Sequence, residues 1–221
     1  MPADAHELGR GVYDLAEAAR YTRLNYSTVR SWFHGKADRE PVFRGDYGRV
    51  RGDYAISFFD LVDLLVAGQL RAAGVTMRIV RASYEVLQSD IGTSHPFCHE
   101  RIYTDGKRVI VAVASQIGDA RLLDVVSRQQ LFTSIRSVLK SIDYRTKLAM
   151  LWKISNGVVI DPRRSFGKPV VAGTGVTTFV LANQFHANAG NVELVADLYA
   201  VGRRDVLNAV DFEERYGRAA A

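Results

Sequence analysis

Residues 13–33 read Tyr13-Asp-Leu-Ala-Glu-Ala-Ala-Arg-Tyr-Thr-Arg-Leu-Asn-Tyr-Ser-Thr-Val-Arg-Ser-Trp-Phe33, with apolar residues at helical spacing. Asp14 is placed to cap a first helix that ends near Tyr21, and Asn25 to cap a second that ends near Phe33. Gly35 then follows as a helix terminator. Two short helices joined by a tight turn are typical of a helix-turn-helix.

A polar, glycine-rich segment follows this pair of helices. We expect residues 42–44 and 50–51 to be the arms of a hairpin around residues 45–48, which would form a wing. In helix-turn-helix motifs the N-terminal half of the second helix enters the major groove, where hydroxyls and arginine bind bases and phosphates. The predicted DNA-contacting residues of this helix and of the wing are Ser27, Thr28, Arg30, Ser31, Arg44, Arg49 and Arg51.

The remainder of the first half and the middle of the chain have further local signals. Ser57 and Asp60 form a capping-box pattern at the start of an apolar helix over residues 58–73. Thr76 is placed to cap another helix, which ends near residue 89. Residues 102–111, with β-branched arms around an Asp-Gly pair, predict a type I′ hairpin. A helix over 129–141 and strands over 148–154 and 158–160 complete a small α+β middle region.

The last segment begins near Ile160 and predicts helices over 178–187, 192–199 and 203–216. The last two helices again have the pattern of a helix-turn-helix. It is either a second DNA reader, a protein interface or a packed core, and the acidic balance of this segment disfavours DNA. The candidate contact residues of this pair are Arg203, Arg204 and Asn208.

Charge is unevenly distributed along the 221 residues, whose formal net charge is +5. Residues 121–176 contain ten basic and three acidic residues, whereas residues 177–221 contain four basic and six acidic ones. A basic middle and an acidic end are compatible with nucleic acid plus a protein partner. The composition excludes a disordered or fibrous chain. No apolar run approaches the roughly 20 residues that span a bilayer, and the single cysteine, Cys98, indicates a reducing, cytoplasmic location.

Motifs for catalysis or metal binding are incomplete. His95, Cys98 and His99 lie within five residues, but a zinc site generally needs four ligands, so we interpret them as structural. The glycines near Lys168 and Gly175 lack the pattern of a phosphate-binding loop, and no nucleophile elbow occurs. We therefore expect no catalytic residue, no metal, no cofactor and no enzymatic activity.

Two families resemble this chain in different parts of its sequence. Residues 13–22 and 25–32 resemble the winged helix-turn-helix of MerR-type regulators and phage excisionases, although Arg23 stands where that family's turn usually has glycine. The VapB-like antitoxin domain, long described as a domain of unknown function, is similar to residues 159–162 and 166–174, the helix at 192–199, and residues 205–206 and 209–212. Gly175-Val176 stands where many of its members have Arg-Ile. The whole order resembles a long, non-standard class of VapB-type antitoxins.

This resemblance implies a bacterial type II toxin–antitoxin pair. The chain would neutralise a PIN-domain ribonuclease and repress its own operon, as a homodimer that matches a symmetric operator. An arginine among the carboxylates that hold the ribonuclease's metal would compete with metal and RNA phosphate. The candidates for this role are Arg163, Arg164, Arg215 and Arg218. The alternatives are a MerR-like, ligand-sensing regulator without a toxin, and an enzyme that binds a nucleotide at residues 167–175.

The expected fold class is α+β and mostly α. We divide the chain into a winged helix-turn-helix with a helical pair at residues 1–90, an α+β middle at 91–157, and a helix-turn-helix-like antitoxin domain at 158–221.

Overall fold

The computed structural model describes residues 10–35, 40–50, 52–102, 105–118 and 129–217, with the backbone alone for residues 129–134. Its secondary structure is mixed and mostly helical, which confirms the predicted α+β class. The first half contains, in order, β1 (Tyr13–Asp14), α1 (Leu15–Thr22), α2 (Tyr26–His34), β2 (Arg49–Val50), β3 (Asp53–Ile56), α3 (Phe58–Ala72), α4 (Met77–Ile91), the 3-10 helices Pro96–Cys98 and Glu100–Ile102, and α5 (Gly106–Ile117). The second half contains α7 (Gln129–Lys140), β4 (Ile142–Arg145), β5 (Leu148–Ser155), β6 (Val158–Ile160), the 3-10 helix Ser165–Gly167, β7 (Val170–Val171), α8 (Thr178–Ala187), α9 (Val192–Tyr199) and α10 (Arg203–Gly217).

The first two helices begin where the sequence places their caps. Asp14 accepts a hydrogen bond from the Glu17 amide in a capping box, and Asn25 accepts one from the Ser27 amide. In the turn between them Arg23 adopts a left-handed conformation with a φ of 56°. A residue other than glycine therefore makes this tight turn, at a cost in free energy that glycine would avoid.

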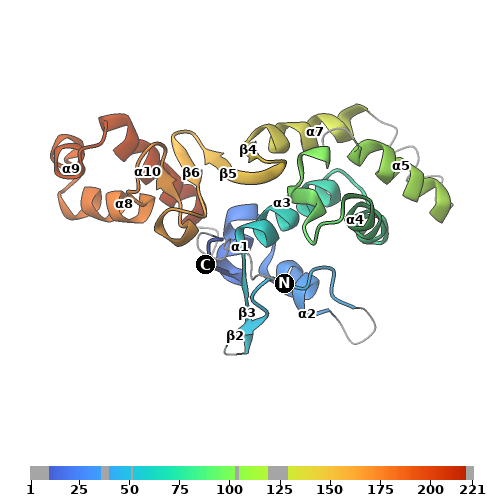
Figure 1. The fold of residues 1–221 in the computed structure, drawn as a ribbon. Coiled ribbons are helices and arrows are strands. Elements are labelled where there is room, and N and C mark those ends of the chain that lie inside the picture. Colours follow the sequence, from blue (N-terminus) through green and yellow to red (C-terminus); the bar gives the residue numbers. More distant parts are fainter. Residues whose placement is uncertain (1–9, 36–39, 51, 103–104, 119–128, 218–221) are drawn as a thin grey trace.

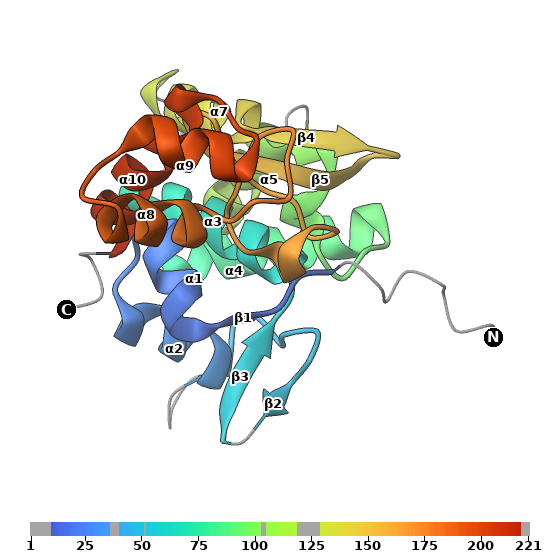
Figure 2. The same ribbon diagram turned by 90° about the vertical axis from the view of Figure 1, so that its left-hand side faces the viewer.

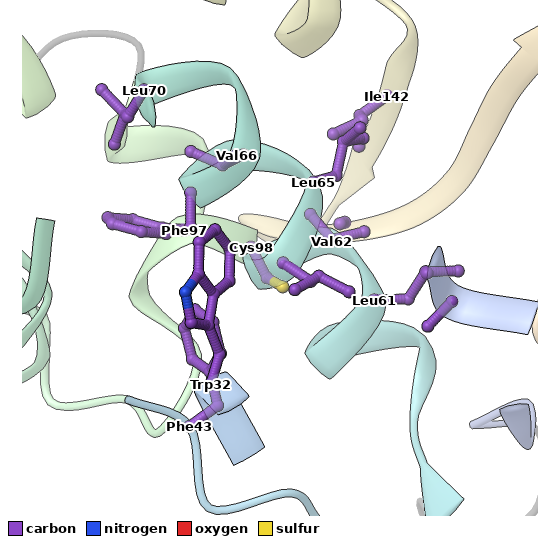
Figure 3. Close-up of a cluster of buried hydrophobic side chains, with 14 of the residues drawn as sticks. Trp32, Phe43, Leu61, Val62, Leu65, Val66, Leu70, Phe97, Cys98 and Ile142 are labelled. Carbon is purple, nitrogen blue, oxygen red and sulfur yellow. The ribbon is translucent and has the colours of Figure 1, made fainter. Parts of the chain in front are cut away.

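Helix α3 is the centre of the first hydrophobic core. Ser57 and Asp60 form the predicted capping box at its start. Most of its residues are buried, because α1, α4 and α7 pack around it. Figure 3 shows its side chains between Trp32 and Phe43 on one side and Ile142 on the other. This burial of apolar surface on all sides of one helix is the main stabilising feature of the first half.

The prediction of a hairpin at residues 102–111 is wrong, because residues 106–117 form the helix α5. Helix α5 packs on α4, and its buried residues recur at helical spacing. Gly106 lies so close to Ile102 that a Cβ at Gly106 would be 2.8 Å from the Cδ1 atom of Ile102. The β-branched residues favoured a strand, but burial of one apolar helix face outweighs that preference. The buried residues of α5 are Gly106, Val109, Ile110, Val113 and Ala114.

The hairpin predicted from residues 42–44 and 50–51, with its turn at 45–48, is wrong, and a different hairpin forms before α3. Strand β2 pairs with β3 in the antiparallel sense, across a turn that contains Gly52. The expected first arm, residues 42–44, lies on α2 instead. Its amides at Val42 and Phe43 donate hydrogen bonds to the Trp32 carbonyl at 2.8 and 3.1 Å. The ring of Phe43 is buried against aromatic rings of α2, and this burial holds the segment there.

The strand β1 joins the β2–β3 hairpin in one small sheet, of order β1-β3-β2. A second, antiparallel sheet of order β4-β5-β6-β7 connects the two halves of the molecule. Strands predicted over 148–154 and 158–160 are confirmed as β5 and β6, whereas β4 was not expected. Helix α7 packs against β4, and α10 packs against β6 and β7. The sheet therefore lies between the helices of the first half and those of the C-terminal part, as Figure 1 shows.

The three helices predicted for the C-terminal part are confirmed as α8, α9 and α10. Thr177 and Asn191 cap the first two of them. Together with β7 these helices enclose a second, smaller core of Val171, Leu181, Val195, Ala196, Val206 and Ala209. Among the residues that the structure describes, no helix combines the length and hydrophobicity needed to cross a bilayer.

Residues of the C-terminal part contact β1 and the C-terminal cap of α1. The Tyr13 hydroxyl donates a hydrogen bond to the Gly167 carbonyl at 2.9 Å, and both groups are buried. The Arg23 guanidinium lies 4.7 Å from the centre of the Tyr216 ring. Figure 2 shows α8 and α10 next to α1 and away from the β2–β3 hairpin. The divisions at residues 1–90, 91–157 and 158–221 stay predictions.

Candidate nucleic-acid and partner interfaces

Helix α2 bears four of the residues predicted to contact DNA. Ser27 and Arg30 are exposed, whereas Thr28 and Ser31 are half-buried. The Ser31 hydroxyl donates to the Thr28 carbonyl at 2.8 Å, and the Ser27 hydroxyl lies 2.7 Å from the Asn25 side-chain oxygen. Two of the hydroxyls therefore already have partners within the helix. Arg30 is the long, exposed cation of the set and the best placed to reach a base edge.

The Asp53 carboxylate of the β2–β3 hairpin forms the contacts that hold this hairpin next to α2. The Tyr26 hydroxyl donates to Asp53 at 3.3 Å, and His34 Nε2 lies 3.2 Å from the other oxygen of Asp53. On the hairpin the Arg49 guanidinium lies 5.6 Å from the centre of the Tyr54 ring. Figure 1 shows α2 and the hairpin together at one end of the molecule. These contacts give a basic hairpin a fixed position next to the exposed face of α2.

Sequence reasoning missed the role of Asp53. Its partners are 27 and 19 positions away in the chain, and no local pattern connects them. Burial favours a higher pKa for Asp53, but hydrogen bonds from the Tyr54 amide, His34 and Tyr26 outweigh it, so the pKa lies below its usual value. Of the other predicted contacts, Arg44 is exposed in the loop before the hairpin, and Arg51 lies outside the described residues.

A buried charged network supports that loop from inside. His95 Nδ1 lies 2.8 Å from Asp63 Oδ2, and His95 Nε2 lies 3.0 Å from Asp46 Oδ1. The Tyr84 hydroxyl donates to the same Asp63 oxygen at 2.7 Å, and the Phe97 amide donates to the other oxygen at 3.1 Å. The network joins α3, α4 and the segment after α4 to the loop that leads into the hairpin.

The electrostatics of the network favour a charged His95. Burial by itself would lower the pKa of His95, but hydrogen bonds and charges from Asp46 and Asp63 outweigh it and raise that pKa to about 10. The hydrogen bond from His95 lowers the pKa of Asp46 to about 2. Burial raises the pKa values of Asp60 and Asp63. Asp46 is therefore the ionised partner of the imidazolium, and the loop is attached to the core by charge as well as by hydrogen bonds.

Three groups of this network have the chemistry of metal ligands. Atoms of Asp63, His95 and Cys98 lie within 4.8 Å of one another. The Cys98 thiol donates to the Phe59 carbonyl at 3.0 Å, and His95 and Asp63 are hydrogen-bonded to each other. All three groups are thus used in hydrogen bonds, and the structural interpretation of His95, Cys98 and His99 stays a prediction.

The loop between β6 and β7 contains two of the arginines predicted to reach the partner. Arg163 places Nε and Nη2 at 2.8 and 2.7 Å from the two carboxylate oxygens of Asp161. Arg164 donates from Nη1 to the Thr174 carbonyl at 2.8 Å. The Asp161 side chain is 4% exposed, whereas each arginine side chain is 48% exposed. The surface of the loop is therefore cationic, with its acidic group underneath.

The candidates on α10 differ in their surroundings. Arg203 is exposed and pairs with Glu193 of α9 at 3.1 Å, and Arg204 is exposed on the same first turn. Asn208 is half-buried, and a Cβ at Gly157 would lie 2.4 Å from its Nδ2 atom. The close fit between Asn208 and the β5–β6 turn indicates packing for this residue, whereas the two arginines are available to a partner.

The last two candidates lie near the C-terminus. Arg215 pairs with Asp211 along α10 at 2.8 Å, and Arg218 lies outside the described residues. The structure thus gathers the predicted DNA contacts around α2 and the hairpin. The described partner candidates lie on α10 and on the β6–β7 loop, and that loop contacts Val12 and α1.

Comparisons with known proteins agree with the antitoxin resemblance. Residues 158–212 match a family model described as a protein of unknown function, DUF433. The chain is 29% identical over 223 residues to a protein named "Putative antitoxin VapB45" from Mycobacterium tuberculosis, which covers 90% of this chain and 92% of that relative. The crystal structure of Rv2018 from Mycobacterium tuberculosis superposes with a TM-score of 0.75 at 26% identity, over 90% of this chain and 97% of that one. The chain is therefore similar along most of its length to a VapB antitoxin.

Proposed function

We propose that this chain is the antitoxin of a type II toxin–antitoxin pair, which binds a PIN-domain ribonuclease and represses its own operon. The observation that carries the proposal is the similarity to a VapB antitoxin along 90% of the chain. The region that matches the DUF433 family contains α8, α9 and most of α10. The function is one of binding rather than catalysis.

The N-terminal part supplies the DNA-binding face of the proposed repressor. Helix α2 acts as the recognition helix, and its Arg30 reaches a guanine through two hydrogen bonds. Arg44, Arg49 and Arg51 contact phosphates from the loop and the hairpin, in the manner of a MerR-type wing. A homodimer presents two copies of this face to a symmetric operator. The Asp53 and His95 contacts support this proposal because they fix the loop and hairpin relative to α2.

The C-terminal part supplies the face that meets the ribonuclease. A guanidinium that enters a cluster of metal-binding carboxylates neutralises it and competes with RNA phosphate. Of the described candidates, Arg163 and Arg164 both pair with the buried Asp161, whereas Arg215 pairs with the half-exposed Asp211 and is the freer to reorient. Arg203 and Arg204 add exposed cations on α10. This face is separate from α2, so one chain can hold both partners.

Co-expression tests the proposal with the full chain. The gene beside this one is expressed with it, and the mixture is purified through a tag on the chain and passed over a size-exclusion column. We expect one complex that contains a PIN-domain ribonuclease and that also shifts a DNA fragment from the operon's promoter in a gel. A chain that elutes alone and leaves the promoter fragment unshifted contradicts both parts of the proposal.

A ligand-sensing regulator is the second candidate function, and one observation favours it. A cleft of about 520 Å³ lies beside the loop that leads into the β2–β3 hairpin and is bordered by Arg44, Arg81, Tyr84 and His95. A small molecule in this cleft would contact the network that positions the loop. This function predicts promoter binding without any interaction with the product of the neighbouring gene, so the same co-expression experiment separates the two candidates.

A further inference from the structure

The loop between β6 and β7 contains an aromatic side chain in an unusual setting. Phe166 is 82% exposed, and its backbone is left-handed with a φ of 55°. The preceding Ser165 is also left-handed, with a φ of 46°. Bulky residues rarely adopt this conformation, because the side chain approaches the backbone, and such strain persists only where the surroundings enforce it. The strained backbone here leaves a large apolar ring exposed to water, so the ring adds no buried apolar surface that would stabilise the fold.

The loop around Phe166 is held firmly on both sides. The Ser165 hydroxyl donates to the Gly175 carbonyl at 2.9 Å, and the Gly167 amide donates to the Arg164 carbonyl at 2.8 Å. The Phe166 carbonyl accepts the Val12 amide at 3.1 Å. The backbone that carries the ring is thus held in place before any partner arrives. A rigid aromatic anchor binds a partner at low entropic cost.

The charged side chains around the ring indicate the charge that a complementary partner surface would carry. The flanking Arg163 and Arg164 are half exposed, whereas the acidic Asp161 is buried beneath them. Lys168 follows and pairs with Glu17 of α1. An exposed ring with cationic neighbours fits an apolar recess with acidic groups at its rim.

We propose that Phe166 is an anchor with which this chain enters an apolar recess on its ribonuclease partner, while Arg163 and Arg164 meet acidic groups at the rim. This inference rests on the proposed function and adds the contact surface. A protein partner fits better than a nucleic acid, because one ring offers no series of stacking platforms. The C-terminal helices also expose other apolar side chains that suit a protein interface: Phe179, Leu194, Leu198 and Leu207.

Affinity measurements on the full chain test the anchor. The variant Phe166→Ala removes the ring, and its exposed position predicts an unchanged fold, which circular dichroism checks. Phe166→Leu keeps part of the apolar surface. The matched control is Val86→Ala, which removes an apolar side chain that is 38% exposed on α4. Each protein is titrated with the purified ribonuclease that the neighbouring gene encodes, in its catalytically inactive form.

We expect Phe166→Ala to bind the ribonuclease about 30-fold more weakly, as is typical of a buried aromatic hot spot. Phe166→Leu is expected to have an affinity between those of the wild type and Phe166→Ala, and Val86→Ala to bind like the wild type. Equal affinity of Phe166→Ala and wild type overturns the anchor but leaves the proposed function intact. A wild-type chain that does not bind the ribonuclease overturns both. Loss of promoter or single-stranded RNA binding in Phe166→Ala, with ribonuclease binding preserved, assigns the ring to nucleic acid and also overturns the inference.

Discussion

Replacement of His95 by glutamine removes the positive charge of the buried network while keeping a hydrogen-bonding side chain of similar size. The pKa of His95 is raised to about 10 in the folded chain, from 6.5 in the unfolded chain. A raised pKa stabilises the fold fully below pH 6.5, and this contribution is lost as the pH rises towards 10. Between pH 7 and 9 the folded chain holds nearly one more proton than the unfolded chain. The free energy of unfolding should therefore fall by about 1 kcal/mol per pH unit, or about 2 kcal/mol over the interval.

Urea denaturation followed by circular dichroism measures this dependence in the wild type and in His95→Gln. We expect the wild type to lose about 2 kcal/mol more than the variant between pH 7 and 9. Burial also raises the pKa of Cys98, so both proteins lose some stability at the upper end, and the difference between them isolates His95. At pH 7 the variant should be less stable by about 3 kcal/mol, because Asp46 and Asp63 lose their charged partner. Parallel pH profiles for the two proteins would refute a charged His95.

Three further outcomes follow from individual contacts. Gly167→Ala should destabilise the fold by at least about 2 kcal/mol in thermal denaturation, because φ is +82° and the new Cβ would lie 2.2 Å from the Tyr13 hydroxyl oxygen; an unchanged melting temperature would refute this packing. Tyr13→Phe should cost about 1 kcal/mol in urea denaturation by leaving the buried Gly167 carbonyl without its donor, and a neutral effect would show that water replaces the hydroxyl. Arg30→Ala should weaken promoter binding by roughly 10- to 100-fold in fluorescence anisotropy and relax its sequence preference; wild-type affinity in the variant would remove α2 from the DNA interface.

Local signals predicted most helices of this chain. The caps at Asp14, Asn25 and Ser57 each act within three residues, so the sequence alone contains the information that starts α1, α2 and α3. The sequence also predicted α8, α9 and α10, the last of them to within one residue of its observed end. Apolar side chains of these helices form the second core together with Val171.

Predictions failed where distant contacts decide the conformation. Residues 102–111 contain the local features of a hairpin, but packing of the apolar face of α5 on α4 makes the segment helical. Phe43 was assigned to a strand, but its ring is buried against α2. The candidate sites behave in the same way. Arg30 was identified from its place on a helix, whereas the His95–Asp46 contact joins residues 49 positions apart and has no sequence signature.

We propose that this chain silences a ribonuclease by direct binding. The test is to measure how fast the purified product of the neighbouring gene cleaves RNA while the full chain is titrated into it. We expect cleavage to fall to background once the chain reaches an equivalent amount, and Phe166→Ala to require a higher concentration. Cleavage that continues at its initial rate in a large excess of folded chain would show that the chain does not inhibit the enzyme.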